Sequence, residues 1–189
     1  MNRRSIILVS VLFIGIIAIA VYCLAHREPV YKGKHLSKWL GDLAMESSTS
    51  QDEPACAVRA IGTNALPWLM TMVRSTDPAW KRAVLAFNTK QRAIRIAVTP
   101  AVVARFDAVQ GYRVLGSAAK GNVPELIHLL ETEPSPQVRS SIAQALGAIG
   151  PAARAAIPAL RRAAQDNDKE LRLNATFALA DIQGWNERR

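Results

Sequence analysis

Two similar stretches decide the fold: Gly121–Gly150, GNVPELIHLLETEPSPQVRSSIAQALGAIG, and Ala155–Gly184, AAIPALRRAAQDNDKELRLNATFALADIQG. Pro124 and Pro158 hold equivalent places in the two stretches, and the later positions align after a slip of one residue. A third, shorter copy surrounds Ile61–Pro67, IGTNALP. Self-similarity at a nearly constant interval indicates a repeat architecture, in which each unit stacks on its neighbours to bury its apolar face.

Each unit has the pattern of two helices. A proline stands near the first turn of the first helix, where its missing N–H costs nothing. A turn rich in Asp, Pro, Ser or Asn follows, and the second helix carries alanine and aliphatic residues at helical spacing. A glycine then supplies the left-handed cap. The sequence therefore predicts an all-α fold, a short α-solenoid of about three stacked helical hairpins.

These residues resemble the HEAT repeat, in its short bacterial form related to the phycobilisome-lyase type. The resemblance covers about Ala55 to Gly184. It implies a non-enzymatic scaffold that binds proteins through a helical-repeat surface. The stretch Tyr31–Leu40, YKGKHLSKWL, placed before Ile61–Pro67, also resembles membrane-anchored HEAT proteins of bacteria.

The first unit departs from the period. Between Trp80 and Gly116 lies a stretch about three times as long as its counterpart in the later units. We predict an enlarged first unit at about 78–116, with helices over roughly 79–97 and 101–115, because a proline at position 100 disfavours helix in the residue before it. Insertions in solenoids often mark a binding face. The whole solenoid is expected over 54–189, after a juxtamembrane linker with a short helix at 27–53.

Residues 1–26 leave the pattern of a soluble domain. Ile6–Ala25 is a long uncharged run, which as a helix spans about 30 Å and is enough to cross a bilayer core. A cleaved secretory signal and a retained anchor both fit, and the length of the run favours the anchor. Arg3 and Arg4 favour a cytoplasmic N-terminus, although basic residues after the run oppose it. We predict a single-pass membrane protein with an extracytoplasmic (periplasmic) body.

Composition excludes several classes of protein. The 189 residues are 50% hydrophobic but only 6% aromatic, and the two cysteines rule out a disulfide scaffold and a four-cysteine zinc site. The histidines, His26, His35 and His128, form no metal-binding spacing, and no glycine-rich phosphate loop is present. We therefore expect no metal, no cofactor and no catalytic residues.

The formal charge of +9 is concentrated in one segment. Arg74–Lys120 holds nine Lys or Arg residues against Asp77 and Asp107. One interpretation is a set of solvated helix faces that maintain solubility. The other is a basic surface that contacts anionic lipid headgroups, an acidic protein or nucleic acid, so that nucleic-acid binding through 74–120 is the alternative function.

Arg139 and Arg172 occupy the same place at the start of their units' second helices. The resemblance to HEAT repeats implies a structural ladder in which such arginines bond a turn aspartate or a carbonyl of the adjacent repeat, and a ligand-facing role is the alternative. The candidate binding residues are Lys81, Arg82, Arg92, Arg95, Arg105, Arg113, Arg139 and Arg172.

Overall fold

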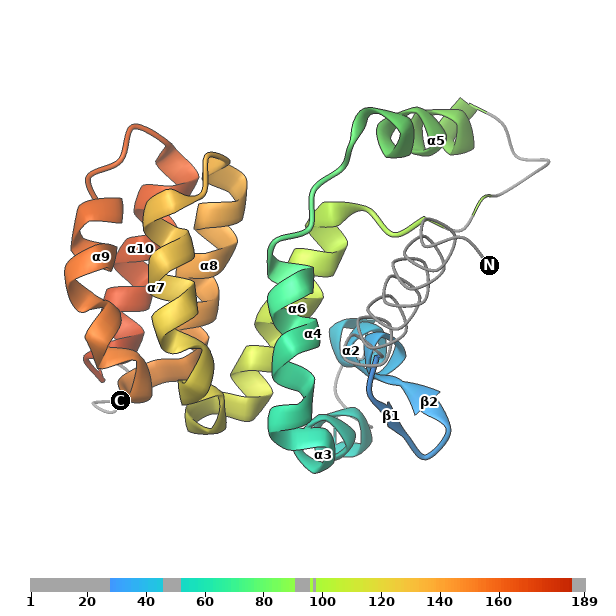
Figure 1. Ribbon diagram of the computed structural model, residues 1–189, viewed down its shortest axis with the longest axis horizontal. Coiled ribbons are helices and arrows are strands. Elements are labelled where there is room, and N and C mark those ends of the chain that lie inside the picture. The colour runs from blue at the N-terminus through green and yellow to red at the C-terminus, as the bar shows by residue number, and fades with distance from the viewer. Residues whose placement is uncertain (1–27, 46–51, 91–95, 97, 185–189) are drawn as a thin grey trace, which may run out of the picture.

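The computed structural model describes residues 28–45, 52–90, 96 and 98–184 (Figure 1). A hairpin of two-residue strands precedes a chain of helices, so the prediction of an all-α repeat fold is confirmed. The elements are β1 (Val30–Tyr31), β2 (Lys34–His35), α2 (Leu36–Met45), α3 (Asp52–Ile61), η1 (Gly62–Ala65), α4 (Leu66–Val73), α5 (Ala79–Lys90), α6 (Ala101–Leu115), η2 (Gly116–Asn122), α7 (Val123–Thr132), α8 (Pro136–Ile149), η3 (Gly150–Ala156), α9 (Ile157–Ala163) and α10 (Lys169–Ile182).

Three hairpins stack side by side: α4 with α6, α7 with α8, and α9 with α10 (Figure 1). We name the first helix of each hairpin the A helix and the second the B helix. The B helix α8 packs against α6 on one side and α10 on the other, and the A helices α7 and α9 are also in contact. The array is therefore two layers of helices, with a layer of A helices beside a layer of B helices.

Local chemistry places the helix ends where the pattern predicts. Each A helix has its proline in the first two positions. Gly116 and Gly150 follow the B helices α6 and α8 with φ of 50° and 72°, which a residue with a side chain rarely adopts. At the other end, Ser135 accepts a hydrogen bond from the Val138 N–H to cap α8.

The B helices approach closely because small residues face one another. Ala143, Ala145 and Ala178 are buried in the shared core. A Cβ on Gly147 would lie 2.9 Å from the Cα of Ala178, so the backbones of α8 and α10 are nearly in contact there. Alanine and glycine thus supply much of the core, which explains how the chain is apolar yet poor in aromatic residues.

Residues 28–45 belong to the packed body. Leu36, Trp39 and Leu40 are buried in the same core cluster as the hairpins. The Trp39 indole N–H donates to the carbonyl of Tyr31 at 3.2 Å, which ties α2 to the strand hairpin. The segment predicted as a linker with a short helix thus contributes α2 to the core, whereas residues 46–51 lie outside the described part of the chain.

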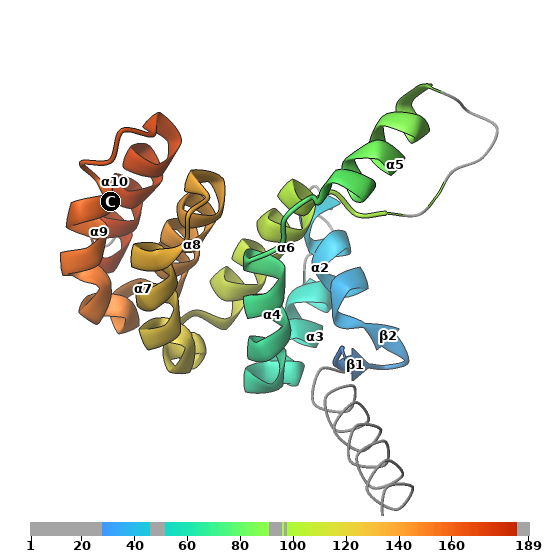
Figure 2. The same cartoon turned by 45° about the horizontal axis from the view of Figure 1, so that its top comes forward.

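The enlarged first unit carries its extra helix between its A and B helices. α5 stands away from the array in both views, and α6 returns the chain to the stack (Figure 2). Of the two helices predicted here, the second coincides with α6, whereas α5 ends at Lys90. Trp80 and Phe87 on α5 have exposed side chains.

The prediction of a single-pass membrane protein is contradicted by the described helices. None of those in 28–45, 52–90 and 98–184 is long and apolar enough to cross a membrane. The longest, α6, has 15 residues, or about 22 Å at 1.5 Å per residue, against about 30 Å of hydrocarbon. The run Ile6–Ala25, from which we predicted the span and the extracytoplasmic body, lies outside the described residues.

Candidate protein-interaction surface

Large apolar side chains are exposed on the two outer B helices. Val102 and Phe106 on α6 are 63% and 49% exposed, and Leu173 and Phe177 on α10 are 50% and 58% exposed. Burying such side chains against a partner removes apolar area from water, which drives association. We call the surface that they share with the middle helix the B-helix face. Its residues are Val102, Phe106, Arg113, Gln137, Ser141, Gln144, Glu170, Leu173, Asn174, Phe177 and Asp181.

Two hollows make this face continuous across the three helices. The larger, about 790 Å³, lies between α8 and α10 and is lined in part by Phe177 and Arg113. The smaller, about 250 Å³, lies beside Val102 and Phe106. Gln144 of α8 lines both hollows, so the apolar side chains of α6 and α10 border one surface.

The charges on the B-helix face are mixed. Arg113 donates to the side-chain oxygen of Gln110 at 3.0 Å. Burial raises the pKa of Asp181, and the positive charge of Arg113 opposes that rise. Glu170 adds a second carboxylate at the other end of α10. An apolar surface with both signs of charge is suited to a protein partner, because association there does not depend on one strong field.

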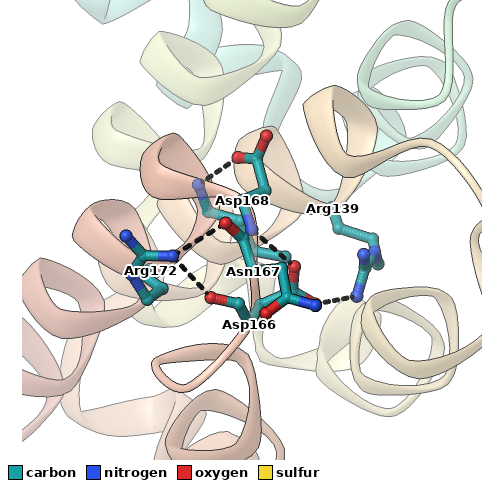
Figure 3. A network of polar contacts seen from close by, with 6 residues as sticks. Arg139, Asp166, Asn167, Asp168 and Arg172 are labelled. Atoms are coloured by element: carbon teal, nitrogen blue, oxygen red, sulfur yellow. Dashed lines mark hydrogen bonds and ion pairs between the residues drawn. The ribbon is translucent and has the colours of Figure 1, made fainter.

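The arginines predicted as a ladder are held by the turns between helices (Figure 3). Arg139 of α8 pairs with Asp166, in the turn of the next unit, at 2.8 Å. Arg172 donates to the carbonyls of Asp166 and Asn167, each at 2.8 Å. The Asp168 N–H, and then the Arg139 guanidinium, lower the pKa of Asp166 against the opposing effect of burial.

The first unit has a third rung that the sequence analysis did not recognise. Arg105 of α6 donates to the carbonyl of Ser75 at 2.8 Å, as Arg172 does to its own turn. The interval from Arg105 to Arg139 equals the interval from Pro124 to Pro158. That spacing is the signal for the rung, and the long insertion before α6 conceals it because it separates Arg105 from the proline of its own unit.

Asp77 closes the turn of the first unit across the insertion. Its two carboxylate oxygens accept from the Ala101 N–H at 3.0 and 3.1 Å, at the start of α6. Its ion pair with Lys81, at 2.8 Å, is the main cause of its lowered pKa. The interval from Pro67 to Asp77 equals that from Pro158 to Asp168, the cap of α10.

The eight candidate residues thus do not form one patch among the described residues. Lys81 is paired with Asp77, and the three ladder arginines are held by turns. Arg82 is exposed on α5. Arg113 lines the larger hollow of the B-helix face, and Arg105 also lines the smaller one. Arg92 and Arg95 lie outside the described residues. Within the same limits, no group of three or more His, Cys, Asp or Glu residues could hold a metal ion.

Residues 112–188 match the sequence model of HEAT repeats. This part of the chain is similar to HEAT repeats. The match begins in α6 and covers the α7–α8 and α9–α10 hairpins, and repeats of this family generally serve as non-enzymatic protein-interaction scaffolds. It lends no support to the phycobilisome-lyase subtype. No curated protein and no solved structure matches the chain.

Proposed function

We propose that this HEAT-repeat chain is a non-enzymatic scaffold that binds a partner protein across the B-helix face. The observation that carries the proposal is the continuity of this face, where exposed apolar side chains on α6 and α10 border hollows that share Gln144. Aromatic side chains beside well-formed hollows are typical anchor points in protein interfaces.

Nucleic-acid binding is less well supported by the same residues. A nucleic-acid surface needs unpaired cations that track the phosphates. Lys81, Arg105, Arg139 and Arg172 are instead engaged by carboxylates or carbonyls of the turns. Within the segment 74–120, Lys81 and Arg105 therefore serve the turn of the first unit and are not free to contact phosphates.

The test compares capture of partner proteins by three forms of the full chain. The wild type, a Phe106→Asp/Phe177→Asp double variant and a Trp80→Asp control are each immobilised and exposed to extracts of the source cells. Trp80 is 64% exposed on α5, away from the B-helix face. Trp80→Asp therefore also replaces an exposed aromatic side chain with a carboxylate, but outside the proposed binding surface. We expect a discrete protein bound by the wild type and the control. Loss of two anchor side chains should weaken that binding by at least about 30-fold.

Equal capture by all three forms would contradict the proposal, as would capture by none of them. Circular dichroism of each variant checks that the fold is intact. Since all the substituted side chains are exposed, the three forms should unfold at similar temperatures.

A further inference from the structure

A separate cleft lies between α2, α4 and α6, outside the B-helix face. Its volume is about 520 Å³, which is in the range of small-molecule sites. The walls combine large apolar side chains with polar and charged ones, as ligand sites commonly do. The residues that the argument uses are Lys38 and Asp42 from α2, Trp68 and Met72 from α4, and Val103 and Asp107 from α6.

Asp107 is the unusual group in this cleft. Its side chain is buried, with 7% exposure, and no described residue forms a hydrogen bond or an ion pair with it. The other buried polar residue of the described chain, Ser140, accepts a hydrogen bond from Asn174 at 2.7 Å. Burying a carboxylate without a partner is costly. Burial raises the pKa of Asp107 to about 6, so the group is still mostly ionised at neutral pH.

The nearby cations do not neutralise Asp107. Lys38 lines the same cleft, but among the described residues it forms no ion pair with Asp107. Lys34 is paired with Asp42, the other carboxylate of the lining. α4 contributes the uncharged side chains of Trp68 and Met72. Among the carboxylates that line the cleft, Asp107 is therefore the one without an ion pair to a described residue.

We propose that this cleft binds a primary alkylammonium group. The ammonium would donate to the Asp107 carboxylate, and the alkyl chain would lie against Trp68 and Met72. A charge-assisted hydrogen bond would replace the water that Asp107 loses on burial, while the apolar walls fit methylene groups. Such a group comes either from a free amine or from a lysine side chain of a protein, and both offer the same chemistry. This site is independent of the B-helix face.

The test is an NMR titration of the ¹⁵N-labelled full chain at pH 7.5. The probes are n-butylamine, butan-1-ol, which has the same alkyl length without the charge, and Nα-acetyl-lysine N-methylamide. The signal followed is the indole N–H of Trp68, assigned with a Trp68→Phe variant. We expect a saturable shift with both amines and none with the alcohol. Tighter binding of the lysine derivative would point to a lysine side chain as the source, and tighter binding of butylamine to a free amine.

Two matched variants make the result specific to Asp107. Asp107→Asn keeps the shape of the side chain and removes its charge, and should weaken amine binding ~10-fold or more. Asp42→Asn removes the carboxylate that is already paired, and should weaken binding less. If Asp107→Asn alters the amide spectrum widely, Asp107→Ser is titrated in its place. Equal shifts with butylamine and butan-1-ol would overturn the proposal, as would unchanged amine binding in the Asp107 variant.

Discussion

The first hairpin and the two that follow it join their helices in different ways. The α7–α8 and α9–α10 hairpins use short turns, whereas the α4–α6 hairpin carries α5 on a long excursion between its helices. The turn of the α4–α6 hairpin is nevertheless closed in a similar way to that of α9–α10. Asp77 accepts a hydrogen bond from the first turn of α6, and Arg105 donates one to the carbonyl of Ser75. Similar polar contacts thus close the turn in hairpins whose connecting chains differ greatly in length, while the helices pack through the shared apolar core.

The largest difference in stability is expected between two Gly→Ala variants. One adds a methyl group in α6 of the first hairpin, and the other adds it in α8 of the second. At Gly147→Ala the new Cβ would lie 2.9 Å from the backbone of α10, which cannot move alone. At Gly111→Ala it would meet the Cδ2 of Leu69 at 2.6 Å, which is the end of a side chain and not backbone. We expect Gly147→Ala to lower the free energy of unfolding by about 1–3 kcal/mol. Gly111→Ala should stay within about 1 kcal/mol of the wild type. Urea denaturation measures both, and equal losses would refute the distinction.

The next prediction concerns a position at which the first unit differs from the others. Asp107 stands at the repeat position that Ser141 and Asn174 occupy in the later units. Burial raises its pKa from 3.8 to about 6, so the folded chain binds its proton more tightly than the unfolded chain does. Its contribution to stability is therefore most favourable below about pH 4 and is lost as the pH rises through about 6.

Asp107→Asn should abolish that pH dependence. At pH 7 the variant should be more stable than the wild type by about 1–3 kcal/mol. Below pH 4 the two should converge. Denaturation curves at a series of pH values measure the difference, and a variant less stable than the wild type at pH 7 would show that Asp107 has a stabilising partner.

A smaller effect is expected from the two capping aspartates. Asp77→Ala removes the acceptor for the Ala101 N–H, and Asp168→Ala removes the acceptor for the Leu171 N–H. Each change should cost about 0.5–2 kcal/mol, the usual effect of losing a helix cap. If Asp77→Ala proves neutral while Asp168→Ala does not, the first hairpin does not depend on this contact. That result would contradict the claim that Asp77 and Asp168 play the same role in their turns.

The last prediction concerns excision of residues 78–101, for which no specific stabilising contact is expected to be lost outside the first turn. The deletion joins Asp77 to Val102 and gives Asp77 and Arg105 the same separation as Asp168 and Arg172. We expect the free energy of unfolding to stay within about 2 kcal/mol of the wild type, since loop-closure entropy varies slowly with length. Calorimetry of the excised chain checks this. Loss of cooperative unfolding would mean that the insertion supports the array.

The repeats could be predicted from the sequence because their period recurs with few changes. The same residue types return at a nearly constant interval, namely proline, the turn residues, arginine and glycine. Each of them favours a particular backbone geometry or makes a particular hydrogen bond. The interruption of that period hid the ladder role of Arg105, although the helix that carries it was predicted at 101–115. Arg105 has the spacing of a ladder arginine, yet it follows a long insertion, and charge alone grouped it with Lys81 and Arg82.

The candidate surface was harder to predict for a physical reason. Val102, Phe106, Leu173 and Phe177 are apolar, so the sequence gives no sign that they are exposed rather than part of the core. Which face of a helix is covered depends on the stacking of neighbours far away in the sequence. Basic residues are conspicuous in a sequence, but here several of them serve the turns.

Photo-crosslinking from the B-helix face tests the central claim most directly. A photoreactive amino acid is placed at position 106 on α6, at position 177 on α10, or at position 80 on α5 as a control. If the face is one binding surface, positions 106 and 177 will crosslink the same partner protein and position 80 will not. Crosslinks to unrelated proteins at 106 and 177, or an equal yield at position 80, would contradict the account.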